Sequence, residues 1–307
     1  MKNMKYQNLY EIIEETSVLM QKFGIDITNI KSSLFQTLNN KYDVPCEYDV
    51  INLLENIKAG YDREIRYRLE KKYYHNITAK IISRLENYKI IKRTGLRGTK
   101  IPTVFYRKYN TEYDKNLINI MKKKLYLYSF INSTSSTAGI YAQILWKQAL
   151  EDSGFNILDE ETNSFGNIKS KINGDIDYIA EKDKIKYGIE IKNSLSYPRD
   201  LMRKMLICIE LGLIPLFIVR WMSKTQFYNI WNNGGLIKIY ETSIYPHKYK
   251  KTIKECREIL GYPMLSINRI TKKPKKHLNY IHGIAVKNIE EIMEKNRDFI
   301  KKNNFIY

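Results

Sequence analysis

A carboxylate-bearing hairpin in the second half of the chain holds the residue types best suited to chemistry. Asp177 lies in the segment GDIDYIA, and Glu190 and Lys192 follow in the segment IKYGIEIKN. Residues i and i+2 of a strand share a face, so Glu190 and Lys192 point one way and Ile191 points into the core. A turn between these two strands would bring Asp177 and Glu190 within reach of one hard cation, which prefers oxygen ligands.

A cation site of this kind is compatible with phosphate chemistry. A Mg²⁺ ion held there would polarise a scissile phosphate and lower the pKa of a bound water. Lys192 would orient that water or stabilise the developing negative charge. Asp175 shares a strand face with Asp177 and is the alternative ligand, but Asp177 directly precedes the apolar run 178–180. The competing interpretation is an ordinary surface hairpin with alternating charges.

The segments around the hairpin predict an α/β core. An apolar stripe predicts a helix over 139–151, and a strand (GFNIL) follows it. After the hairpin, Pro198 lies near the start of an amphipathic helix, and Gly212 is the residue expected just past its end. The continuous apolar run LIPLFIVRW then has the pattern of a buried strand. The predicted order is therefore α-β-β-β-α-β.

In this order and in these residues, the segment from Gly139 to Arg220 resembles the PD-(D/E)xK nuclease superfamily. That superfamily includes restriction endonucleases and archaeal-type Holliday junction resolvases. The resemblance implies a restriction-endonuclease-like core and a Mg²⁺ cofactor, with Mn²⁺ as the alternative. Many members carry a metal-facing glutamate on the first helix, and Gln143 occupies the best-matching position here. The roles implied are catalysis for Asp177, Glu190, Lys192 and Gln143, and metal binding for Asp177, Glu190 and the Ile191 carbonyl.

Residues 45–112 have a different pattern. Apolar positions predict three helices, of which the second follows Asp62 and the third, ITAKIISRLENYKI, follows Asn76. Two β-prone runs come next, separated by the basic, glycine-containing tip TGLRGTK. The order of these elements resembles a winged helix-turn-helix domain, a mostly helical module that precedes the α/β core.

In such a domain, the third helix enters the major groove of DNA and the wing touches the backbone or the minor groove. Residues 61–110 contain 14 Lys and Arg against 4 Asp and Glu, so positive charge is concentrated in this segment. A protein-contact role is the alternative. The resemblance implies DNA contacts from Thr78, Lys80, Ser83 and Arg84 on the helix and from Arg93, Arg97 and Lys100 in the wing.

The remaining segments complete the predicted domain organisation. Residues 1–44 read as an N-terminal helical segment, and residues 113–138 as a connecting helix followed by a Ser/Thr-rich linker, INSTSSTAG. The nuclease domain spans 139–245. The basic extension 246–307 would contact a DNA backbone or be solvated.

Composition agrees with a nucleic-acid partner. The net charge of +19 over 307 residues indicates a polyanionic ligand, DNA before an anionic membrane, although an AT-rich coding sequence also favours lysine. Three scattered cysteines and the lack of a signal-peptide pattern predict a cytoplasmic protein. We expect a Mg²⁺-dependent endonuclease on double-stranded DNA, with a homodimer compatible with cleavage of both strands. The alternatives are a structure-specific nuclease acting on branched DNA and a DNA-binding regulator with an inactive nuclease fold.

Overall fold

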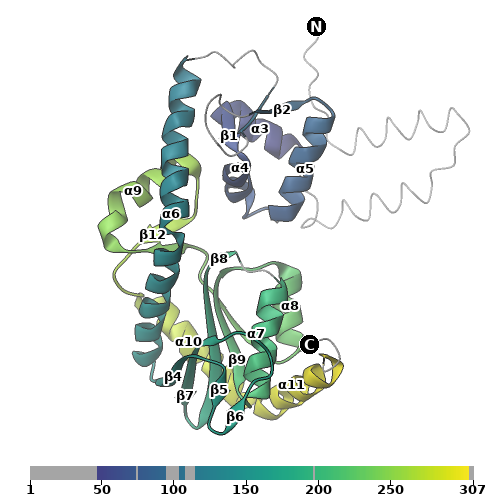
Figure 1. The fold of residues 1–307 in the computed structure, drawn as a ribbon, viewed down its shortest axis with the longest axis vertical. Coiled ribbons are helices and arrows are strands. Elements are labelled where there is room, and N and C mark those ends of the chain that lie inside the picture. Colours follow the sequence, from purple (N-terminus) through teal and green to yellow (C-terminus); the bar gives the residue numbers. More distant parts are fainter. Residues whose placement is uncertain (1–46, 74, 95–103, 108–114, 196–197, 304–307) are drawn as a thin grey trace, which may run out of the picture. The chain divides into compact units, whose positions relative to one another are not determined.

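The computed structural model describes residues 47–73, 75–94, 104–107, 115–195 and 198–303 (Figure 1). It is a mixed α/β protein, as expected, and the chain forms two compact units. The first contains residues 1–129 and 258–262, and the second contains 130–257 and 263–307. The predicted N-terminal segment 1–44, together with Arg97 and Lys100, lies outside the described residues.

The first unit packs three helices on a small antiparallel sheet. Its elements follow the predicted order, with one added strand, β1, that pairs with β3. The strand order is β1-β3-β2. Its core is formed by the apolar stripes of the helices, including Leu54, Ile65 and Leu85. The elements are α3 (Glu47–Ile57), β1 (Ala59–Tyr61), α4 (Asp62–Leu69), α5 (His75–Asn87), β2 (Ile91–Thr94) and β3 (Val104–Arg107).

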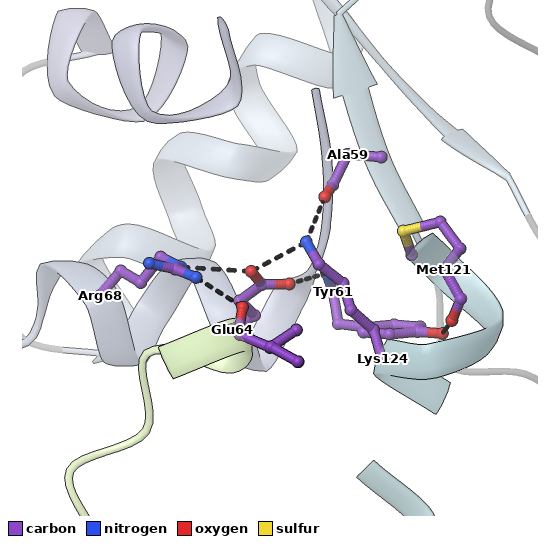
Figure 2. Close-up of polar contacts among 7 residues, drawn as sticks. Ala59, Tyr61, Glu64, Arg68, Met121 and Lys124 are labelled. Carbon is purple, nitrogen blue, oxygen red and sulfur yellow. Dashed lines mark hydrogen bonds and ion pairs between the residues drawn. The ribbon is translucent and has the colours of Figure 1, made fainter. Parts of the chain in front are cut away.

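A buried ionic cluster joins α4 to the long helix α6 (Lys115–Glu151) within this unit (Figure 2). The Glu64 carboxylate is fully buried and lies 2.9 Å from Lys124 Nζ and 3.2 Å from Arg68 Nε. It also accepts a hydrogen bond from the Tyr61 N–H, and Lys124 donates to the Ala59 carbonyl. Glu64 therefore anchors the start of α4, where a negative charge is favoured by the helix dipole.

Helix α6 corrects one prediction. The Ser/Thr-rich segment 131–139 was expected to be a linker, but it is helical and continuous with the residues before and after it. The Thr134 hydroxyl donates to the Phe130 carbonyl at 2.7 Å, and Ser133 and Ser135 make similar bonds to the preceding turn. Relative to alanine, each serine or threonine reduces helix stability by only about 0.5 kcal/mol. A run of them without proline can therefore stay helical.

The second unit is built on a five-stranded mixed sheet with strand order β10-β9-β8-β7-β4 (Figure 1). Strand β7 pairs antiparallel with β4 and β8, while β8, β9 and β10 run parallel. The predicted order α-β-β-β-α-β is observed, with a small extra ribbon, β5–β6. The elements are β4 (Asn156–Thr162), β5 (Ser164–Phe165), β6 (Ile168–Lys169), β7 (Ile176–Lys182), β8 (Ile185–Leu195), α7 (Pro198–Glu210), β9 (Ile214–Trp221), α8 (Lys224–Asn232) and β10 (Leu236–Ile239).

Helices cover both faces of this sheet. One core cluster joins Ile189 and Ile191 of β8 to the C-terminal part of α6, including Trp146. The other joins the opposite sheet face to α7 and α8 through residues such as Met205 and Ile230. Strand alternation sends the side chains of Glu190 and Lys192 toward the α7 face. The sheet thus positions the predicted site between β7, β8 and α7.

Glycine permits the close approach of α7 to β8. A Cβ atom added at Gly188 would lie 2.4 Å from Cys208 Sγ, well inside van der Waals contact. Cys208 is fully buried on α7. Any larger residue at 188 would push α7 away from the strand that carries Glu190.

The basic extension after residue 245 belongs to the second unit, apart from residues 258–262. Leu278, Ile281 and Ala285 of α10 join the core beneath the sheet, and Phe299 of α11 joins the other cluster. These helices are therefore structural, whatever their lysines contact. The remaining elements are β11 (Ser243–Tyr245), α9 (Lys250–Glu255), the π-helix Cys256–Leu260, β12 (Met264–Ser266), α10 (Lys272–Lys287) and α11 (Ile289–Asn303).

Candidate metal centre

Asp177 and Glu190 lie where the β7–β8 ladder ends. The two strands are joined by a two-residue loop, Asp183 and Lys184, both with positive φ, and their register runs to the pair Tyr178 and Ile189. The next residue of β7 is Asp177. Its side chain, and not its backbone, bonds to β8: Oδ2 accepts the Ile191 N–H at 2.6 Å. The predicted hairpin therefore places Asp177 at the side of Glu190.

Gln143 approaches the same aspartate from α6. Its Nε2 donates to Asp177 Oδ1 at 2.8 Å. The helix is held over the sheet by neighbouring core residues such as Leu145 and Trp146. Both oxygens of Asp177 thus accept hydrogen bonds from groups that the sequence analysis placed at the site.

Glu190 is the most buried group of the cluster, with 1% of its surface exposed. Lys192 Nζ lies 2.6 Å from Oε1, and Lys204 Nζ of α7 lies 3.3 Å from Oε2. These contacts are ion pairs: within the described residues, no donor meets either oxygen at a hydrogen-bonding angle. The two ammonium groups offset part of the cost of burying this carboxylate, and its oxygens keep lone pairs that make no aligned hydrogen bond.

Burial and the nearby carboxylate change the acidity of this cluster. Burial, followed by the charge of Glu190, raises the pKa of Asp177 to about 7, although the Ile191 N–H and the two lysines oppose the shift. Burial alone would lower the pKa of Lys192, but attraction to Glu190 and Asp200 outweighs it and the pKa is raised. Lys192 is therefore an ammonium ion held among carboxylates.

The donor types of the cluster fit a hard divalent cation. Two adjacent carboxylates repel each other, and a cation between them would relieve both this repulsion and the unsatisfied oxygens of Glu190. The described part of the chain contains no group of three or more His, Cys, Asp or Glu side chains that could share a metal ion. An ion here would therefore depend on Asp177, Glu190 and neutral oxygens such as the Gln143 amide and the Ile191 carbonyl.

Asp175, the alternative ligand, takes a different position. Its side chain is exposed, and its backbone carbonyl accepts a bond from Lys204 Nζ. Asp177, in contrast, lies close enough to Glu190 that the charge of Glu190, after burial, contributes to the raised pKa of Asp177. The geometry thus favours Asp177 as the partner of Glu190.

Sequence reasoning missed Asp200. Its carboxylate lies 3.2 Å from Lys192 Nζ and accepts a hydrogen bond from Arg203 at 2.8 Å. The signal was weak, since an acidic residue in the first turn of a helix is common for reasons of helix stability alone. Arg220, near the end of β9, is fully buried.

The predicted DNA-contact residues of the first unit divide into three groups. Lys80, Ser83, Arg84 and Arg93 are exposed; Arg84 pairs with Glu47 and Arg93 with Glu86. Arg97 and Lys100 lie outside the described residues. The placement of Thr78 on the exposed face is wrong, because its side chain is fully buried. Thr78 precedes Ile81 and Ile82 by one helical turn, so it shares their inward face.

Comparisons with known proteins add no family to this description. None of the protein-family models matches the chain, and no curated protein matches it. Among the described residues, no helix combines the length and the apolar character needed to cross a membrane.

Proposed function

We propose that this chain is a Mg²⁺-dependent DNA endonuclease of the PD-(D/E)xK type. The observation that carries the proposal is the pairing of Asp177 with the buried, hydrogen-bond-deficient Glu190, beside the ammonium of Lys192. The surrounding order α6-β4-β7-β8-α7-β9 and the mixed sheet support it, since they match the core expected for that superfamily.

The residues of the site have separate parts in this proposal. Asp177 and Glu190 would hold the cation, with Gln143 fixing the orientation of Asp177. A bound Mg²⁺ would supply Lewis-acid polarisation of the phosphate and a more acidic water. Lys192, kept protonated by its carboxylate neighbours, would stabilise the negative charge that develops on the phosphate oxygens.

The first unit would position the DNA. Its order α3-β1-α4-α5-β2-β3 and its sheet order β1-β3-β2 support a winged helix-turn-helix assignment. Helix α5 exposes Lys80, Ser83 and Arg84, which would reach base edges or phosphates in the major groove.

The decisive experiment compares the wild type with Asp177→Asn, and uses Asp159→Asn on β4 as a control for the same charge change at an exposed carboxylate. Linear, supercoiled and four-way-junction DNA are incubated with Mg²⁺ or with EDTA. We expect Mg²⁺-dependent cleavage by the wild type and by the control, and loss of at least about 10³-fold of the rate in Asp177→Asn. Absence of cleavage of every substrate by the wild type contradicts the enzyme assignment.

Two observations favour a second function, a DNA-binding regulator that has lost nuclease activity. Gln143 brings no negative charge where many members of the superfamily have a glutamate. Two lysines, Lys192 and Lys204, lie against Glu190 and offset its negative charge. DNA binding without cleavage in the same experiment supports the regulator, and cleavage of junctions alone supports the structure-specific nuclease.

A further inference from the structure

The Lys192 ammonium lies between two carboxylates that come from different elements. Glu190 Oε1, on the same strand, is 2.6 Å away, and Asp200 Oδ2, on α7, is 3.2 Å away. Lys204, one turn further along α7, contacts the other oxygen of Glu190 at 3.3 Å. Helix α7 thus faces the site with both a carboxylate and an ammonium.

Asp200 is itself held in place. Arg203 Nη2 donates to its Oδ1 at 2.8 Å, which leaves Oδ2 directed at Lys192. The Arg203 guanidinium lies near Gly174: a Cβ atom added at this position would be 3.7 Å from Arg203 Cζ. The φ of +117° at Gly174 is one that other residues rarely adopt. Asp200 also lies in the first turn of α7, where the helix dipole favours a negative charge. Asp200 is therefore fixed by Arg203 on its own helix and by its place at the helix start.

The two carboxylates around Lys192 differ in what a cation would do to them. Glu190 would turn its oxygens to the cation, and its hold on Lys192 would weaken. Asp200 is not among the candidate cation ligands and would keep its contact with Lys192. Without Asp200, a long and flexible lysine side chain would have no remaining carboxylate to fix its position beside the site.

We propose that Asp200 is the positioning residue for Lys192: it holds the ammonium at the site when Glu190 is engaged by the cation. This inference rests on the proposed nuclease function. Asp200 acts through Lys192 and does not touch the reacting phosphate. With Asp200, the group of carboxylates and lysines at the site includes a residue of α7, and Arg203 holds that residue in place.

The test uses the full chain and three variants. Asp200→Asn keeps the size of the side chain and removes its charge, Asp200→Glu restores the charge, and Asp298→Asn on α11 is the matched control at an exposed aspartate. Mg²⁺-dependent cleavage of linear duplex DNA is measured as kcat and KM. We expect Asp200→Asn to lower kcat about 10- to 100-fold with KM unchanged, Asp200→Glu to recover part of the loss, and the control to behave as wild type.

A second measurement does not depend on activity. The Tm of Asp200→Asn, Lys192→Met and the double variant is determined with EDTA present. We expect the double variant to lose less than the sum of the single losses, because the two side chains stabilise the protein through one shared contact. Additive losses, or an Asp200→Asn protein with wild-type kcat, overturn the inference while the nuclease function stands. A wild type that cleaves no DNA overturns the function itself, and the coupling in Tm then shows whether Asp200 holds Lys192.

Discussion

Two buried glutamates show how the same residue type is used differently in the two units. Glu64 has two cationic partners and a backbone N–H, and it lies at the start of a helix. Glu190 is equally inaccessible but has ion-pair contacts alone. Both carboxylates are paired with cations, but Glu64 alone of the two also has aligned hydrogen bonds. At the scale of single residues, hydrogen-bond satisfaction therefore separates a structural carboxylate from a candidate functional one.

Replacing Lys124 by Met should destabilise the protein in a pH-dependent way. Burial raises the pKa of Glu64 even in the wild type, and the charges of Lys124 and Arg68 offset only part of this shift. Without Lys124 the pKa of Glu64 rises further. The folded state then keeps a proton that the unfolded state releases above its pKa of about 4.3, so stability falls as pH rises from there.

Chemical denaturation at pH 5 and pH 8 would measure this effect. We expect a loss of about 3–5 kcal/mol in the free energy of unfolding at pH 8, as for other broken buried ion pairs, and a smaller loss at pH 5. Glu64→Gln combined with Lys124→Met should recover much of the loss, because no unpaired charge remains. An equal loss at both pH values would contradict the assigned role of Glu64.

At the scale of elements, the site depends on how closely α7 approaches β8. The helix carries Asp200 and Lys204, and the strand carries Glu190 and Lys192. Gly188 allows this approach, because the space of its missing side chain is filled by Cys208. The packing of one helix on one strand therefore controls the geometry of four charged groups.

Replacing Gly188 by Ala should separate these two elements. The added methyl would overlap Cys208 Sγ, and overpacking of this kind costs about 1–3 kcal/mol. Denaturant titration would measure the loss. Adding Cys208→Ala removes the overlapping sulfur and should restore part of the stability. If Gly188→Ala alone is as stable as wild type, the close contact does not constrain the two elements.

At the scale of the whole molecule, the positive charge is the dominant property. The net charge of +19 is spread over both units, and exposed basic residues occur on α5 of the first unit and at the start of α10 of the second. A charge of this size attracts any polyanion. A test for a specific DNA-binding face must therefore compare the loss of charge on that face with an equal loss of charge elsewhere.

Replacing Lys80 and Arg84 by alanine tests whether α5 is that face. We expect weaker duplex binding. The slope of log Kd against log[salt] should also decrease by about 1–2, because two phosphate or base contacts are lost. Lys122→Ala with Lys123→Ala on α6 removes the same charge elsewhere in the first unit. Fluorescence anisotropy at several salt concentrations would measure both. Equal losses in the two double variants would contradict a dedicated role for α5.

Most of the elements, and the face on which the key residues lie, can be predicted from the amino-acid sequence. A period of two in the hairpin places Glu190 and Lys192 on one side, and helical periods define the core stripes of α3, α4 and α5. Both are local properties of the backbone, so they can be read from neighbouring residues. The same local logic failed for the segment 131–139, because hydroxyl bonds to the preceding turn allowed the helix to continue.

Which charged groups meet depends on the packing of distant elements. Asp200 reaches Lys192 because α7 packs on β8, and Lys124 meets Glu64 across 60 residues of sequence. The hydrogen bond from Gln143 on α6 to Asp177 likewise depends on how α6 packs on the sheet. Such contacts depend on how elements pack, and packing is a sum of many small, distant interactions that no short stretch of sequence contains.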